Sequence, residues 1–215
     1  MRHFDLHCDT LSRCRSQKQG LFGNDGALSV ERGLIFDQWV QAFAVFIDDE
    51  KRGVKAYREF LAQAEILQKA IASDDRIVPF DKDNIREGAC NAMLTVENGA
   101  AIGGKLERIE GFAQLGVKVF SLVWNGENEL AGGVHSEMGL TDFGRKAVRE
   151  LEKNGIIIDV SHLNSLSFWD LCEVAERPFI ATHSNCFEIC PNRRNLDDLQ
   201  IEEIIRRKGL IGINF

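Results

Sequence analysis

The chain has 215 residues, of which 44% are hydrophobic and 27% charged, so it holds enough apolar material for one sizeable core. Its formal net charge of -7 and its lack of a basic run argue against a nucleic-acid partner. No apolar stretch approaches the roughly 18 residues of a membrane span, and no basic segment followed by an apolar one opens the chain. A cytoplasmic protein without membrane contact is therefore expected.

Short apolar runs alternate with amphipathic helical patterns along the chain. This alternation is typical of βα units arranged around a parallel sheet. The apolar runs predict strands over residues 3–10, 38–47, 91–98, 117–124, 155–162, 178–184 and 209–215.

Two of the intervening segments carry a clear helical period. Residues 54–73 place an apolar stripe along one helix face, made of Tyr57, Phe60, Leu61, Ala64, Leu67 and Ile71. A second helix is expected after Thr141 as N-cap and ends at Gly155. Its buried face is predicted to contain Phe143, Ala147, Val148 and Leu151.

The glycine-rich pieces "ENGAAIGG" and "ELAGG" fit neither a dinucleotide-binding fingerprint nor a phosphate-binding loop. Repeated βα units without such a motif favour a (β/α)8 barrel over a doubly wound sheet. One barrel domain over residues 1–215 is the expected organisation. In a barrel the chemistry lies at the carboxyl ends of the strands, so polar residues that end apolar strands are the candidate functional residues.

The opening stretch "MRHFDLHCDT" places a histidine and an aspartate one residue apart, at His7 and Asp9. Residues at i and i+2 of a strand share a face, so the two side chains are expected to project together. An imidazole and a carboxylate on one face can bind a divalent transition metal. The alternative is a surface strand end that carries two polar residues.

Three further predicted strands end in a side chain that can bind metal: Glu97, His162 and His183. Each alone has a structural explanation, such as a turn or a local hydrogen bond. Together with His7 and Asp9 they would meet at one barrel mouth. Two metal ions about 3.5–4 Å apart need a bridging carboxylate and terminal ligands, and Glu97 would be the bridge.

Zinc is favoured by the mixture of nitrogen and oxygen ligands, although manganese and iron suit the same groups. His7 and Asp9 would complete one metal site, and His162 with His183 the other. His3 and His135 are not expected to be ligands, because His3 precedes the end of its strand and His135 lies in a glycine-rich loop.

At these residues the sequence resembles the zinc-dependent membrane (renal) dipeptidase family, a branch of the amidohydrolase superfamily with a (β/α)8 barrel. The resemblance implies hydrolysis of the peptide bond of dipeptides through a metal-bridging hydroxide. The matching pieces are "DLHCDT", "LTVENG", "SLVWNGENELAGG", "GLTDFGRKAVRELEKNGIIIDVSH" and "ATHSNCFEICPNRRNLDD".

The resemblance also implies roles for individual residues. It implies two zinc ions per chain, bridged by Glu97, with His7 and Asp9 on one ion. His162 and His183 would bind the other ion, and Glu97 and His183 are the predicted catalytic residues.

Substrate binding is assigned by the same resemblance to Arg194, Trp124 and Asn128. Arg194 matches the family residue that holds the free carboxylate of the substrate, and a guanidinium can do so through two parallel hydrogen bonds. The alternative for Arg194 is a solvated loop residue that pairs with Asp197 or Asp198.

Two features depart from the family pattern. Trp124 stands where many members have a substrate-binding histidine, and an indole cannot take up a proton. The chain stops at "GLIGINF", the expected seventh strand, so an eighth strand and its aspartate have no counterpart. A barrel truncated in this way is expected to bind metal weakly, to have little peptidase activity and to favour self-association through unpaired strand edges.

Two other functions stay open at this point. One is another metal-dependent amidohydrolase, acting on a cyclic amide or an N-acyl amino acid. The other is a non-catalytic metal-binding remnant. The dipeptidase ranks first of the three functions, and Trp124 modestly raises the other two.

Overall fold

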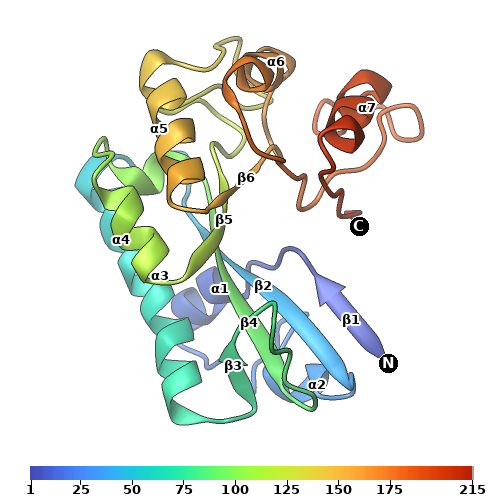
Figure 1. Cartoon of the computed structure of the whole chain (residues 1–215). Helices are drawn as coiled ribbons and strands as arrows, with labels where there is room; N and C mark the ends of the chain where they lie inside the picture. Colours follow the sequence, from blue (N-terminus) through green and yellow to red (C-terminus); the bar gives the residue numbers. More distant parts are fainter. Residues whose placement is uncertain (215) are drawn as a thin grey trace. The chain divides into compact units, whose positions relative to one another are not determined.

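A computed structural model describes residues 1–214 (Figure 1). Contacts within the chain define two compact units. The first unit contains Met1–Phe46 and Arg58–Thr95, and the second contains Ile47–Tyr57 and the chain from Val96 onward. Both units are built from parallel strands and helices, so the α/β class is confirmed, whereas a single barrel domain over 1–215 stays a prediction.

The first unit is organised around two long strands, β2 (Gln38–Phe46) and β4 (Cys90–Glu97), and β4 runs on into the second unit. Their residues are almost all buried, which explains their continuous apolar runs. β1 (Arg2–Asp5) pairs in parallel with β2, and β3 (Ile77–Pro79) with β4. The first unit also contains α1 (Thr10–Gln17), α2 (Val30–Gly33) and, from Arg58 onward, α3 (Gly53–Ser73).

The second unit continues the βα alternation. β5 (Val117–Ser121) pairs in parallel with β6 (Ile157–Asp159), and Val119 lies opposite Ile157. Single parallel bridges then join Asp159 to Ile180 and Ala181 to Ile211. The helical segments of this unit are η1 (Gly99–Ile102), α4 (Arg108–Gln114), α5 (Asp142–Lys153), α6 (Ser165–Val174) and α7 (Asp198–Arg206) (Figure 1).

The strand expected over residues 3–10 is wrong beyond Asp5. The side chain of Asp5 accepts a hydrogen bond from the backbone N–H of His7 at 3.1 Å, which gives that group a local partner in place of a strand ladder. The chain then turns into α1 at Thr10. His7 and Asp9 therefore lie in the connection after β1 and not on one face of a strand.

Other predicted strands are shorter than expected. β5 ends at Ser121 and β6 at Asp159, so Trp124 and His162 lie in the loops that follow these strands. The runs over 178–184 and 209–215 form only isolated bridges within the described residues, and Phe215 lies outside them. β3 was not predicted, because three residues are too few for a periodic pattern to appear.

Both predicted helices are confirmed. In α3, Phe60, Ala64 and Leu67 are buried as expected, but Leu61 is 40% exposed and does not belong to the buried stripe. In α5, Ala147, Val148 and Leu151 are buried, whereas Phe143 is half-buried. Within residues 1–214, no helix combines the length and the apolar character needed to cross a membrane.

The glycine-rich piece "ELAGG" has a packing role in the loop after β5. A Cβ atom at Gly133 would lie 2.2 Å from the backbone oxygen of Trp124, which no side chain tolerates. The close approach is fixed by a hydrogen bond from the N–H of Gly133 to the carbonyl of Gly126 at 2.8 Å. The absence of a side chain at Gly133 lets the loop fold back beside the residues that follow β5.

Replacement of the α5 N-cap should destabilise the second unit. The Thr141 hydroxyl accepts from the N–H of Gly144 at 2.9 Å and donates to the carbonyl of Glu129 at 2.7 Å. Thr141→Ala removes both bonds, so the free energy of unfolding in urea should fall by about 1–2 kcal/mol. Thr141→Ser keeps the hydroxyl and should lose less than half as much, and equal losses in the two variants would contradict the capping role.

Candidate metal and substrate site

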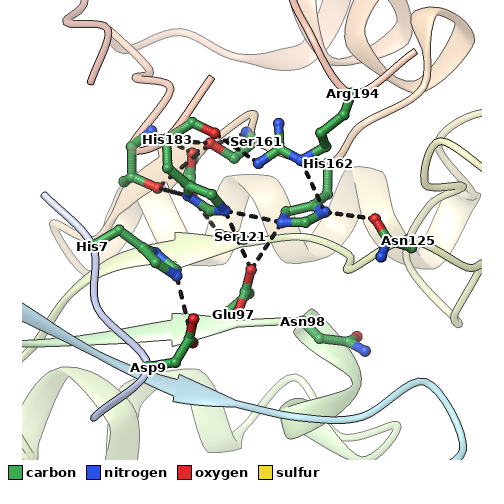
Figure 2. Close-up of polar contacts among 12 residues, drawn as sticks. His7, Asp9, Glu97, Asn98, Ser121, Asn125, Ser161, His162, His183 and Arg194 are labelled. Atoms are coloured by element: carbon green, nitrogen blue, oxygen red, sulfur yellow. Dashed lines mark hydrogen bonds and ion pairs between the residues drawn. The ribbon is translucent and has the colours of Figure 1, made fainter. Parts of the chain in front are cut away.

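A buried carboxylate meets two imidazoles in the second unit (Figure 2). Glu97, the last residue of β4, is 3% exposed. Its Oε1 lies 2.8 Å from His162 Nε2 and 3.4 Å from His183 Nε2, and the two Nε2 atoms are 2.9 Å apart. One carboxylate oxygen and two imidazole nitrogens thus converge on one point away from bulk water.

The backbone around β6 aims His162 at this point. β6 ends at Asp159, and His162 adopts a left-handed conformation with φ of 73°. Asn98, directly after Glu97, also has a positive φ of 82°. Such conformations cost a non-glycine residue about 1–3 kcal/mol and concentrate at functional sites. The His162 ring therefore reaches this point through a strained backbone conformation in the turn after β6.

The other ring nitrogen of His162 has two neighbours. His162 Nδ1 lies 2.9 Å from Asn125 Oδ1 and 3.1 Å from Arg194 Nε (Figure 2). Burial lowers the pKa of His162 to about 4, against the opposing effect of the Glu97 carboxylate. His162 is therefore a neutral imidazole at pH 7, with one protonated and one unprotonated nitrogen.

His183 has a different kind of support. Its Nδ1 lies 2.7 Å from the hydroxyl of Thr182, which donates to Asp159 Oδ2 at 2.7 Å. Burial alone would raise the pKa of Asp159, but the neighbouring His183 and hydrogen bonds from Ser121 and Thr182 lower it below its ordinary value. Asp159 is therefore an ionised carboxylate in the protein interior.

Arg194 reaches the same place from the loop before α7. Its Nη1 donates to Ser184 Oγ at 2.9 Å, and its Nη2 donates to the carbonyl of His183 at 2.8 Å. Burial lowers the pKa of the guanidinium, although Asp159 and Glu97 oppose this effect, and the group stays charged. The alternative of a solvated loop residue paired with Asp197 or Asp198 does not describe these contacts.

A cavity of about 360 Å³ lies beside His162 and Arg194, wholly within the second unit. Leu163, Leu166 and Phe187 supply apolar wall, while Ser184 and Asn195 supply polar groups. A concave space of this size, with apolar walls and a few polar groups, is typical of small-molecule sites.

The remaining predicted residues are placed as follows. In the first unit, His7 Nε2 lies 3.5 Å from Asp9 Oδ1, and the Asp9 side chain is 56% exposed. In the second unit, the Trp124 ring centroid is 6.4 Å from that of His162. The Asn128 amide donates to Asn98 Oδ1 and to the carbonyl of Leu122, and its oxygen accepts from the N–H groups of Leu130 and Ala131. A substrate-binding role for Asn128 stays a prediction.

Sequence reasoning missed several residues in and around the site, among them Asn125, Asp159 and Thr182. For Asp159 a signal existed, because a charged residue inside the apolar run "IIIDVS" is unusual unless it is paired. Asn125 and Thr182 directly adjoin the predicted residues Trp124 and His183, and nothing in their own identity distinguishes them from loop residues. The two histidines excluded as ligands lie elsewhere: His3 stacks on Phe36, and His135 is exposed.

Several known proteins are similar to this chain. It is 33% identical over 144 residues to an uncharacterized protein in the pqqA 5' region of Klebsiella pneumoniae. The aligned residues cover 63% of this chain and 53% of that protein. It is 27% identical over 168 residues to Dipeptidase tcpJ of Claviceps purpurea, covering 74% of this chain and 40% of that protein. The matches thus span about half the length of these relatives.

Solved structures share the fold over the whole chain. The structure of the dipeptidase AC, a metallo peptidase of family M19, is 26% identical with a TM-score of 0.87, covering 100% of this chain and 72% of that one. A metallo peptidase from Rhodobacter sphaeroides, liganded with a phosphinate mimic of the dipeptide L-Ala-D-Ala, is 24% identical with a TM-score of 0.86, covering 100% and 74%. The arrangement of strands and helices is therefore that of these enzymes.

A family model described as membrane dipeptidase, peptidase family M19, matches residues 1–215. This match covers every predicted ligand and the loop that carries Arg194. The chain belongs to the membrane dipeptidase family.

Proposed function

We propose that the protein is a zinc-dependent dipeptidase. The observation that carries the proposal is the convergence of His162 and His183 on one oxygen of the buried Glu97 carboxylate, with the Arg194 guanidinium against His162. Membership of the membrane dipeptidase family supports the same reaction. The Rhodobacter enzyme was crystallised with a dipeptide mimic as its ligand, which supports a short peptide as substrate here.

The residues of the second unit fit a zinc ion by their chemistry. Glu97, His162 and His183 provide oxygen and nitrogen donors, and the two Nε2 atoms face the carboxylate with little solvent access. We further propose that His7 and Asp9 of the first unit would bind a second zinc ion. When bound, zinc would activate a water for attack and polarise the scissile carbonyl.

A ligand histidine must present an unprotonated Nε2. For His162 this requires the proton to lie on Nδ1, where it can be donated to Asn125 Oδ1. Arg194 Nε–H competes for the same nitrogen, and its bond forces the proton onto Nε2, facing Glu97. Without metal the Arg194 bond should prevail, because a charged donor forms the stronger bond and Nε2–H satisfies the carboxylate.

Arg194 would hold the carboxylate of the substrate. A guanidinium has five N–H groups, and three of its nitrogens each use one in contacts with Ser184, His183 and His162. Two N–H groups therefore remain for a ligand. Because Arg194 lines the cavity beside His162, a bound carboxylate would place the adjacent peptide bond near the histidine pair.

Metal content should test the ligand assignment directly. When the purified protein is titrated with zinc, it is expected to reach about two zinc ions per chain at saturation, measured by inductively coupled plasma mass spectrometry. Glu97→Ala and His183→Ala should each lower the zinc affinity at least tenfold, because each removes a ligand. His135→Ala is the matched control, since His135 is exposed and predicted not to be a ligand. Equal zinc in all variants, or none in the parent protein, would contradict the proposal.

The position of the His162 proton should depend on Arg194. In the metal-free protein, ¹⁵N NMR is expected to show His162 protonated on Nε2. Arg194→Met removes the competing donor, so the proton should move to Nδ1 and be donated to Asn125. Arg193→Met is the control, because Arg193 is the exposed neighbour of Arg194 in the same loop. An unchanged tautomer in Arg194→Met would show that Arg194 does not control this nitrogen.

Arg194 should also determine the preference for a free carboxylate. The parent protein is expected to hydrolyse a dipeptide at least 100-fold faster, in kcat/KM, than the same dipeptide with an amidated C-terminus. Loss of a charged hydrogen-bonded pair of this kind is worth about 3 kcal/mol. In Arg194→Met this discrimination should collapse, whereas Arg193→Met should keep it.

Zinc content measured in both variants separates substrate binding from metal loss. Discrimination that survives in zinc-loaded Arg194→Met would assign the carboxylate to another residue. Activity that is equal on both substrates in the parent protein would instead favour an amidohydrolase that needs no free carboxylate.

A further inference from the structure

Asp159 is a buried charge that the proposed ligand set leaves unexplained. It is 1% exposed, and its carboxylate oxygens accept hydrogen bonds from groups that are not proposed ligands. A buried carboxylate without partners would be strongly unfavourable, so its position in the interior depends on these donors. One of the donors connects it to His183.

The two oxygens of Asp159 have different partners. Oδ1 accepts from the backbone N–H groups of Ser161 and Thr182, both at 2.9 Å. Oδ2 accepts from the hydroxyls of Ser121 and Thr182. Because an ionised carboxylate only accepts, the Thr182 hydroxyl must direct its proton to Asp159.

This direction fixes the proton on His183. The Thr182 oxygen has given its one proton to Asp159, so towards His183 Nδ1, 2.7 Å away, it can only accept. Nδ1 therefore carries the imidazole proton and Nε2 carries the lone pair that faces Glu97. His162 differs, because its Nδ1 has both an acceptor and a donor beside it.

We propose that Asp159 and Thr182 are positioning residues that hold His183 in the tautomer able to bind metal through Nε2. This inference rests on the proposed function, which makes His183 a zinc ligand. A metal-binding histidine commonly donates its second N–H to an oxygen that fixes its ring and tautomer, and here a hydroxyl passes that role on to a buried carboxylate. His183 is thus set for metal before any metal arrives.

Asp159→Asn tests the direction of the hydrogen bonds without a change in shape. The Asn oxygen must take the place of Oδ1, where two backbone N–H groups need an acceptor. Its NH2 group then faces the Thr182 hydroxyl, which becomes an acceptor there and donates to His183 Nδ1 instead. In the metal-free variant the His183 proton should therefore move from Nδ1 to Nε2, as seen by ¹⁵N NMR with His183→Gln to assign the signal.

Thr182 provides the second test. Thr182→Val keeps the side-chain volume and removes the hydroxyl, so zinc affinity should fall about tenfold or more. Thr182→Ser restores the hydroxyl and should bind zinc within about threefold of the parent protein. Thermal melting of each variant, without metal, reports any loss of fold separately from the loss of affinity.

The outcomes separate the inference from the proposed function. A parent protein that binds no zinc refutes the proposed function, while the NMR result on metal-free protein still decides the proton on His183. A His183 proton that stays on Nδ1 in Asp159→Asn overturns the inference. Zinc affinity in Thr182→Val equal to that of the parent protein would also overturn it. A purely structural role for Asp159 would lower the melting temperature of its variant without moving the His183 proton or changing the zinc affinity.

Discussion

A carboxylate can remain charged in a protein interior only if donors replace the water it has lost. Two of the buried carboxyl groups of the second unit, Glu97 and Asp159, differ in their partners. Asp159 receives two backbone N–H groups and two hydroxyls, which fill both its oxygens. Glu97 instead faces two imidazole nitrogens that crowd one oxygen. Backbone and hydroxyl donors thus satisfy Asp159, whereas we propose that Glu97 and its two imidazoles bind zinc.

This contrast explains the layout of the segments that follow β6. The turn after β6 supplies the backbone N–H of Ser161 to Asp159, and the next residue, His162, directs its ring at Glu97. The chain at Thr182 and His183 does the same, with a backbone N–H to Asp159 and a ring towards Glu97. Both segments therefore hold one carboxylate with their backbone and approach the other with a side chain.

Much of this site could be predicted from the sequence, because polar residues that end apolar runs are visible in one dimension. Glu97, His162, His183 and Arg194 were found in this way or by family resemblance, and the structure brings these four together. The long helices α3 and α5 were equally visible, since their periodicity and the Thr141 cap are local features. The end of β4 at Glu97 was predicted correctly, whereas the first strand, β5 and β6 end earlier than expected.

The failures have a common physical cause. The strands stop where a local side chain takes over a backbone N–H, as Asp5 does for His7 and Asp159 does for Ser161. The strand propensity of the residues cannot reveal this competition for a backbone N–H, because the competition depends on the conformation of the turn that follows the strand. The left-handed backbone of His162 is also invisible in its residue type. Thr182 and Asn125 act only through a neighbouring histidine, so their roles need three-dimensional contacts.

The competition between Asn125 and Arg194 for His162 Nδ1 links the proposed metal binding to the proposed substrate binding. An Nε2 that gives its lone pair to a cation leaves the imidazole proton on Nδ1, where Asn125 can accept it. Arg194 Nε–H then faces an N–H and can no longer donate to that nitrogen. One guanidinium donor is thereby released at the wall of the cavity. The protonation that makes His162 a ligand is therefore also the one that leaves Arg194 better able to hold a carboxylate.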